Sequence, residues 1–231
     1  MKINTKLLAA LESRGLSEPT LAQSSTWPVI DSGSNVLLIA PTGVGKTEAA
    51  MVPLFHRLLE KDLQPISILY ITPLRSLNRD MLRRLEDIGS ELNLSVAVRH
   101  GDTSQSERSR QSRNPPQILI TTPETLQIML SGKKLRKNLS GVNAVVIDEV
   151  HELASSERGA QLSIALERLT LLAGDFQRIG LSATVGTPKE VSSFLVGDRD
   201  VEILTPKLER NMDLLVHAPE PVSYTHLTLP T

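Results

Sequence analysis

The chain has 231 residues, enough for one sizeable domain or two small ones. No run of about 18 apolar residues occurs, which excludes a membrane span, and the absence of cysteine excludes disulfides and cysteine-ligated metals. The net charge of −1 excludes a global basic field for nucleic acid, and the 3% aromatic content argues against a surface that stacks on bases. With no secretory signal at the N-terminus, we expect a cytoplasmic protein.

Short runs rich in valine, isoleucine and leucine alternate along the chain with stretches of helical periodicity. The runs span 35–40, 67–72, 95–99, 117–122, 143–148 and 177–183. The helical stretches span 46–61, 74–92, 123–132 and 158–174. Runs that are apolar throughout are typical of strands covered on both faces. The alternation predicts an α/β fold with a mostly parallel sheet, helices on both faces, and ligands outside the carboxyl ends of the strands.

The first such end carries a glycine-rich loop, "APTGVGKT", over residues 40–47. Gly43 and Gly45 allow the backbone N–H groups to point at an anion, and the helix that follows adds its positive end. Lys46 can reach the β- and γ-phosphates of a nucleotide, and the Thr47 hydroxyl can ligate Mg²⁺. Ala40 stands where the P-loop pattern has glycine, and a plain strand-helix turn is the alternative. The residues predicted to hold the nucleotide here are Thr42, Gly43, Val44, Gly45, Lys46 and Thr47.

A second strand ends in the acidic pair Asp148 and Glu149, within "VVIDEVH". Such a pair alone is typical of a solvated loop. Beside a phosphate loop, Asp148 can hold the Mg²⁺ shell, and Glu149 can orient and deprotonate the attacking water. A metal ion would offset the repulsion between the two carboxylates.

Polar residues also follow three other strands. Ser182, Ala183 and Thr184 lie in "GLSATVG", and the small hydroxyl groups of Ser182 and Thr184 suggest a link between the nucleotide site and a neighbouring surface. The segments "TPLRSL" (72–77) and "TTPE" (121–124) each follow a strand and open a helix. Both are good helix caps, and both also offer backbone N–H groups to phosphate.

One further polar residue lies ahead of the first strand. Gln23 in "EPTLAQSSTWPVI" carries an amide that both donates and accepts, so it can match the edges of adenine. The same residue on its own is typical of an exposed surface.

In order, these motifs resemble the first motor domain of a superfamily 2 helicase, over roughly residues 14–205. The phrases "PTGVGKTEAA", "PLRSLNRDMLRRL", "RHGDTSQSER", "DEVHEL" and "RGAQLSIALERL" are most similar to the Lhr (large helicase-related) type. The resemblance implies a P-loop RecA-like fold over 1–215 and ATP bound in a cleft between two such domains. It also implies that ATP and Mg²⁺ are the cofactors.

The resemblance assigns a role to each motif. Gln23 would contact adenine, Lys46 and Thr47 the phosphates and Mg²⁺, and Asp148 the metal. Glu149 would be the catalytic base, and Lys46 would also be catalytic through its contact with the phosphates. One strand of nucleic acid would lie along Pro73, Arg75, Thr122 and Pro123. Hydrolysis would be coupled to movement by His151, Ser182, Ala183 and Thr184.

Lhr-type proteins move on single-stranded DNA in repair or recombination, so the resemblance favours DNA over RNA as partner. Two alternatives stay open: an RNA remodelling enzyme of the same superfamily, and a single-domain ATP-binding switch. Motifs of the second motor domain do not occur in this sequence, among them the arginines that approach the γ-phosphate. We therefore expect that domain in cis, and expect this chain alone to bind ATP weakly, hydrolyse it very slowly and unwind nothing.

The end of the sequence departs from the pattern. Residues 216–221 resemble the start of a linker toward the second motor domain. Residues 222–231, "VSYTHLTLPT", match one reading frame of a transposase-end adapter used in sequencing libraries. We expect these ten residues to be adapter read as protein, and exclude them from the fold.

Overall fold

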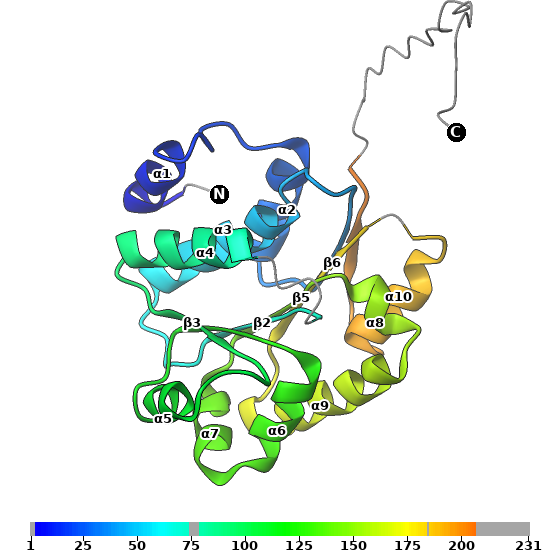
Figure 1. The fold of residues 1–231 in the computed structure, drawn as a ribbon. Helices are drawn as coiled ribbons and strands as arrows, with labels where there is room; N and C mark the ends of the chain where they lie inside the picture. Colours follow the sequence, from blue (N-terminus) through cyan, green and yellow to red (C-terminus); the bar gives the residue numbers. More distant parts are fainter. Residues whose placement is uncertain (1–2, 74–78, 184, 207–231) are drawn as a thin grey trace, which may run out of the picture.

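A seven-stranded parallel sheet forms the centre of the computed structural model, which describes residues 3–73, 79–183 and 185–206 (Figure 1). The strands are β1 (Val36–Ile39), β2 (Ile68–Ile71), β3 (Val96–Arg99), β4 (Ile118–Thr121), β5 (Ala144–Ile147), β6 (Gln177–Ser182) and β7 (Glu202–Leu204). Their order in the sheet is β3-β4-β2-β5-β6-β1-β7, and every pairing is parallel. The predicted α/β fold is confirmed, with β7 as an additional edge strand.

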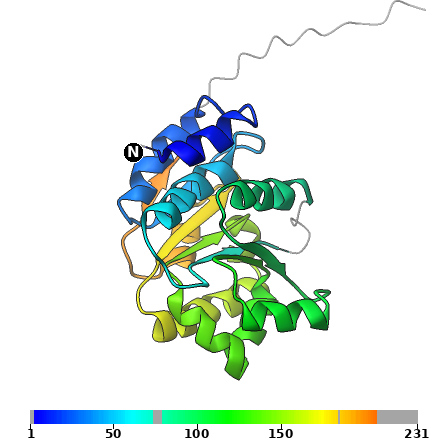
Figure 2. The ribbon, with the colours of Figure 1, turned by 90° about the vertical axis from the view of Figure 1, so that its left-hand side faces the viewer.

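Helices cover both faces of this sheet (Figures 1 and 2). On one face lie α1 (Thr5–Glu12), α2 (Leu21–Asp31), α3 (Lys46–Glu60) and α4 (Arg79–Glu91). On the other lie α6 (Pro123–Ser131), α7 (Lys133–Asn138), α8 (Val150–Ala154), α9 (Glu157–Ala173) and α10 (Pro188–Val196), with α5 (Gln105–Arg113) beside α7. None of the helices in this described part is long and apolar enough to cross a lipid bilayer.

Side chains that alternate along each strand divide the core into two layers. Leu38 and Val146 pack toward α1–α4, whereas their neighbours Leu37 and Val145 pack toward the helices on the opposite face. Because both faces are covered, β1, β2, β4, β5 and β6 are buried at every position. This double burial is the reason that the strands read as continuous apolar runs in the sequence.

Seven of the α-helices and strands described above have no counterpart among the predicted ones, namely α1, α2, α5, α7, α8, α10 and β7. Of these, α5 and β7 show the reason most clearly. The sequence of α5, "QSERSRQSR", has no apolar periodicity, and Ser104 caps it by accepting a hydrogen bond from the N–H of Glu107. Strand β7 has only three residues, two of them exposed, and it forms by pairing with β1. Neither element has the hydrophobic pattern on which the prediction depends.

Several predictions concern residues outside the described part of the chain. These are Arg75, Thr184, and the segments 216–221 and 222–231.

Candidate active site

The glycine-rich loop opens a cavity of about 530 Å³ at the carboxyl end of β1. This cavity brings together Gln23, residues 42–47 of the loop, Asp148 and Glu149, which lie far apart in the sequence. The remaining lining residues are Leu16, Thr20, Glu48, Met81 and Arg84. The residues that the sequence analysis assigned to nucleotide and metal therefore border one cavity.

The loop has the backbone geometry that an anion site requires. Gly43 and Gly45 have φ angles of 82° and 81°, in the left-handed region where residues other than glycine are strained. A Cβ on Gly45 would also collide with the amide of Gln23. No side chain caps the start of α3, so the first N–H groups of this helix remain available to an anion.

Lys46 lies at the base of this loop and is almost fully buried. Its ammonium donates hydrogen bonds to the carbonyl oxygens of Ala40, at 2.9 Å, and Pro41, at 3.3 Å. An ammonium has three donors, so one remains after these two bonds. A phosphate in the loop would compete with the two carbonyl oxygens for the Lys46 ammonium.

Asp148 is held from two sides. Its Oδ2 accepts a hydrogen bond from the hydroxyl of Tyr70 at 2.7 Å, and its Oδ1 accepts one from the N–H of Glu149 at 2.9 Å. Burial raises the pKa of Asp148, and these two hydrogen bonds oppose the rise. The sequence analysis did not predict Tyr70, although a hydroxyl within the aliphatic run "SILYIT" was a signal for it.

Glu149 has a strained backbone next to this carboxylate. Its φ of 47° is left-handed, which is uncommon for a residue other than glycine and occurs often at functional sites. Burial, and then the charge of Asp148, raise the pKa of Glu149. Nδ1 of His151 lies 3.5 Å from Oε2 of Glu149 and makes no hydrogen bond within the described residues. The predicted base and the predicted coupling histidine are thus neighbours.

The oxygen atoms here fit Mg²⁺. Hydroxyl and carboxylate oxygens are the ligands that this hard cation prefers, and Thr47 and Asp148 supply one of each. Within 3–73, 79–183 and 185–206, no group of three His, Cys, Asp or Glu residues could hold a metal by itself. This pattern fits Mg²⁺, which is usually held by one or two protein ligands together with substrate phosphates.

Gln23 is engaged with the protein on both ends of its amide. Oε1 accepts from the N–H of Thr20 at 3.0 Å in a capping box, and Nε2 donates to the carbonyl of Gly45 at 3.4 Å. Gln23 therefore ties the start of α2 to the phosphate loop. An amide retains one N–H and one lone pair after these bonds, so its predicted contact with adenine stays a prediction.

The residues predicted to bind nucleic acid follow neighbouring strands. Pro73 follows β2, and Thr122 and Pro123 follow β4, which pairs with β2. Thr122 caps α6 by accepting a hydrogen bond from the N–H of Thr125 at 3.4 Å, and Pro123 is the first residue of that helix. Thr122 therefore has the predicted capping role, and the two segments lie at the same edge of the sheet.

Ser182 lies at the end of β6, beside the start of the phosphate loop. It is fully buried, its carbonyl accepts from the N–H of Ala40 at 3.1 Å, and its hydroxyl has no partner within the described residues. Ala183 follows it directly. The hydroxyl is thus available for a further hydrogen bond, and the coupling role of Ser182 stays a prediction.

A charged pair that the sequence analysis missed borders the same cavity. Arg84 of α4 makes an ion pair of 2.9 Å with Glu48, the third residue of α3. The Glu48 carboxylate is only 10% exposed, so this partner offsets the cost of burying it. Both residues lie in helical segments where charges are typical of a solvated face. No sequence signal therefore distinguishes this pair from ordinary surface charges.

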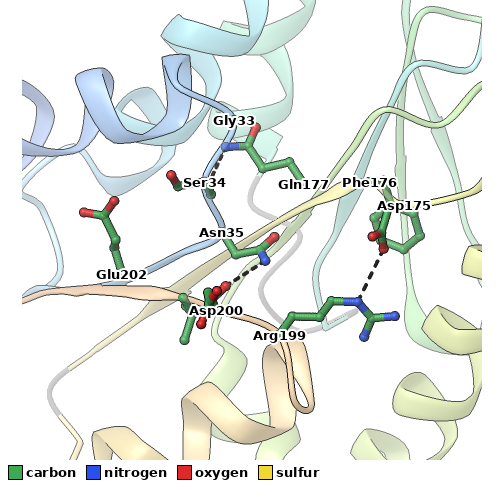
Figure 3. Close-up of a pocket in the computed structure, with 10 residues that line it drawn as sticks. Gly33, Ser34, Asn35, Asp175, Phe176, Gln177, Arg199, Asp200 and Glu202 are labelled. Atoms are coloured by element: carbon green, nitrogen blue, oxygen red, sulfur yellow. Dashed lines mark hydrogen bonds and ion pairs between the residues drawn. The ribbon is translucent and has the colours of Figure 1, made fainter.

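A second hollow, of about 550 Å³, lies at the opposite edge of the sheet, where β1, β6 and β7 begin (Figure 3). Two bonds join residues that line it. Asn35 donates to the carbonyl of Asp200 at 2.8 Å, and Arg199 donates to Asp175 at 3.4 Å. None of the predicted site residues lines it. The residues predicted to hold nucleotide and metal therefore gather at the hollow by the carboxyl ends of the strands, not at this one.

The raised pKa of Glu149 predicts a pH-dependent effect of Glu149→Gln on stability. The folded state holds a proton on this carboxyl more readily than the unfolded state does, so wild-type stability falls as pH rises above the unfolded pKa. The variant removes this loss and should melt higher at pH 7, with each kcal/mol gained seen as about 2–4 °C.

Thermal unfolding from pH 4 to pH 8 checks this, with Glu152→Gln, an exposed residue of the same helix, as the control. The gain should vanish at low pH, where the carboxyl is protonated in both states. A gain that is equal at pH 4 and pH 8 would refute the electrostatic explanation.

A parallel sheet with a glycine loop at one carboxyl end and an acidic pair at another defines a P-loop nucleotide-binding domain. The model of the DEAD/DEAH box helicase family matches residues 20–192. The chain is 42% identical to the Lhr helicase/uracil glycosylase of Escherichia coli over 228 residues, which is 89% of this chain and 15% of that protein. It is 45% identical to the ATP-dependent helicase Lhr-Core of Methanothermobacter thermautotrophicus, over 80% of this chain and 23% of that protein.

The solved structures include one with the same fold. Mycobacterium smegmatis Lhr bound to ssDNA and AMP-PNP superimposes with a TM-score of 0.83 and 38% identity, over 92% of this chain and 29% of that one. The chain therefore belongs to the DEAD/DEAH box helicase family. Its fold is the RecA-like fold of superfamily 2 motor domains, and its sequence is Lhr-like. The chain spans less than a third of the length of these relatives.

Proposed function

We propose that this chain is the ATP-binding motor domain of an Lhr-like, ATP-dependent helicase or translocase that acts on DNA in repair or recombination. The observation that carries this proposal is the meeting of Lys46, Asp148 and Glu149 at one cavity. A phosphate loop, a metal-binding carboxylate and a base are the parts that phosphoryl transfer to water requires.

Each group has a defined task in this reaction. Lys46 and the N–H groups of the loop bind the phosphates, and Thr47 and Asp148 hold Mg²⁺. When bound, Mg²⁺ neutralises charge that develops on the phosphate oxygens. Glu149 orients the attacking water and accepts its proton, and its raised pKa makes it a better base than an ordinary exposed carboxylate. Gln23 contacts the adenine from the side of α2.

The nucleic acid lies along the sheet edge where β2 and β4 end. Main-chain N–H groups near Pro73, Thr122 and Pro123, together with Arg75, hold the backbone of one strand. His151, Ser182, Ala183 and Thr184 connect this edge to the nucleotide. The support for this connection is that His151 neighbours Glu149, and that Ser182 joins the start of the loop.

A second motor domain completes the site in our proposal. Among the described residues, no arginine reaches the cavity from a facing domain. The relatives are several times longer than this chain, which leaves enough length for a second domain in them. The alternatives are an RNA remodelling enzyme, and a single-domain ATP-binding switch that docks a partner protein.

The ATPase activity of the protein with its second motor domain should rise more with single-stranded DNA than with RNA of the same sequence. The two strands differ at the 2′-hydroxyl, so the comparison isolates the group that distinguishes them. Steady-state phosphate release at saturating ATP measures the effect, with Lys46→Ala as the inactive control.

Stronger stimulation by RNA would favour the RNA remodelling enzyme. ATP binding without stimulation by either strand would favour the switch.

A further inference from the structure

Tyr70 occupies an unusual position for a tyrosine in this core. It is the third residue of β2, and it is fully buried. Strand β2 lies next to β5, the strand that ends at the acidic pair. The rest of β2 is aliphatic, and its ring packs in the layer that faces α1–α4. A buried phenol needs a hydrogen-bond partner, because leaving its hydroxyl unpaired costs stability.

The hydrogen-bond partner of this hydroxyl is Asp148, one of the two residues assigned to Mg²⁺. The hydroxyl donates to Oδ2 of Asp148 at 2.7 Å. Burial, and then the charge and hydrogen bond of Asp148, raise the pKa of Tyr70. Tyr70 thus holds the carboxylate at the acidic strand end.

The direction of this bond follows from the chemistry of the groups. A carboxylate only accepts, so the phenol proton must point to Asp148. The bond fixes the orientation of the carboxylate, and a carboxylate has further lone pairs that stay free for a cation in the cavity.

We propose that Tyr70 is a positioning residue of the magnesium site, which sets the Asp148 carboxylate for the metal. The inference rests on the proposed function, since it requires that Thr47 and Asp148 hold Mg²⁺. Residues that orient metal ligands in this way typically change metal affinity about 10–100-fold when they are replaced.

Tyr70→Phe keeps the ring and removes only the hydroxyl. We expect the variant to need about 10–100-fold more Mg²⁺ for half-maximal binding of a fluorescent ATP derivative, N-methylanthraniloyl-ATP, and to bind that probe as wild type does in EDTA. Fluorescence titration of the whole chain gives both quantities. The matched control is Thr121→Val, which removes another buried hydroxyl, bonded to the carbonyl of Arg99 on the neighbouring strand.

A double-variant comparison separates positioning from packing. If Tyr70 acts through Asp148, then Asp148→Ala and the combination of Asp148→Ala with Tyr70→Phe should have the same Mg²⁺ dependence. This pair also decides the matter if Tyr70→Phe alone does not fold, because removing the carboxylate removes the buried charge that the phenol stabilises.

The failures of the two proposals are distinct. A wild-type chain that binds the probe equally in Mg²⁺ and in EDTA would contradict the assignment of Thr47 and Asp148 to Mg²⁺, and the role of Tyr70 with it. A Mg²⁺-dependent wild type with an unchanged Tyr70→Phe variant, or a further loss in the combined variant, would overturn the role of Tyr70 alone.

Discussion

Hydrolysis of ATP by this domain is expected to rise by about 10³–10⁵-fold when a second motor domain is joined to it in cis. In our proposal the cavity holds groups for the metal, the phosphates and the water, while an arginine for the γ-phosphate would come from the second domain. An arginine in that position stabilises charge in the transition state, and it accounts for rate increases of this size in related phosphoryl transfers. Single-turnover hydrolysis by the two proteins measures the difference.

Sequencing the native gene through the codon of Pro221 and beyond tests whether it encodes that domain. A control protein in which the late arginines of that domain are replaced by alanine should hydrolyse ATP as slowly as the single domain does. Rapid, nucleic-acid-stimulated turnover by the present chain alone would contradict the prediction. A gene that ends at Thr231 would leave the ATP-binding switch as the better explanation.

The second large effect is expected from Glu149→Gln in the protein that contains both motor domains. Replacing the base by an amide removes the acceptor of the water proton, and such groups contribute about 10²–10⁴-fold to rates. Binding of ATP should change little, because Lys46, Thr47 and the loop are untouched. Measurement of kcat and of nucleotide affinity on the same preparation checks both parts.

Glu152→Gln is the matched control for this loss of rate. Glu152 carries the same charge on the same short helix but is exposed and does not line the cavity. It should keep wild-type hydrolysis. Equal losses in the two variants would refute the assignment of Glu149 as the base, since they would indicate a general effect of charge on α8.

Glu149→Gln should therefore combine lower activity with higher thermal stability. Two carboxylates crowd one partly buried site, and burial raises the pKa of both. Active sites often keep such unfavourable arrangements because the chemistry needs them. The opposite signs of the two effects distinguish loss of a functional group from loss of the fold.

The sequence by itself determined the parts of this protein that depend on local pattern. The buried strands were readable because both their faces are covered, which leaves a continuous apolar run. Gly43, Gly45, Lys46 and Thr47 were readable because a phosphate loop is built from neighbouring residues, so its spacing survives in the sequence. Their meeting with Asp148 followed from the rule that parallel strands present their carboxyl ends at one edge.

The tertiary structure alone decided which side chains support that site. Tyr70 and Asp148 lie 78 residues apart and meet only because β2 pairs with β5. Arg84 and Glu48 meet because α3 and α4 pack on the same face, and Gln23 turned out to join a helix cap to the phosphate loop. Each of these contacts depends on which strands are neighbours and on how helices cross them. No spacing along the chain records that, because the free energy of these contacts comes from burial and pairing between distant segments.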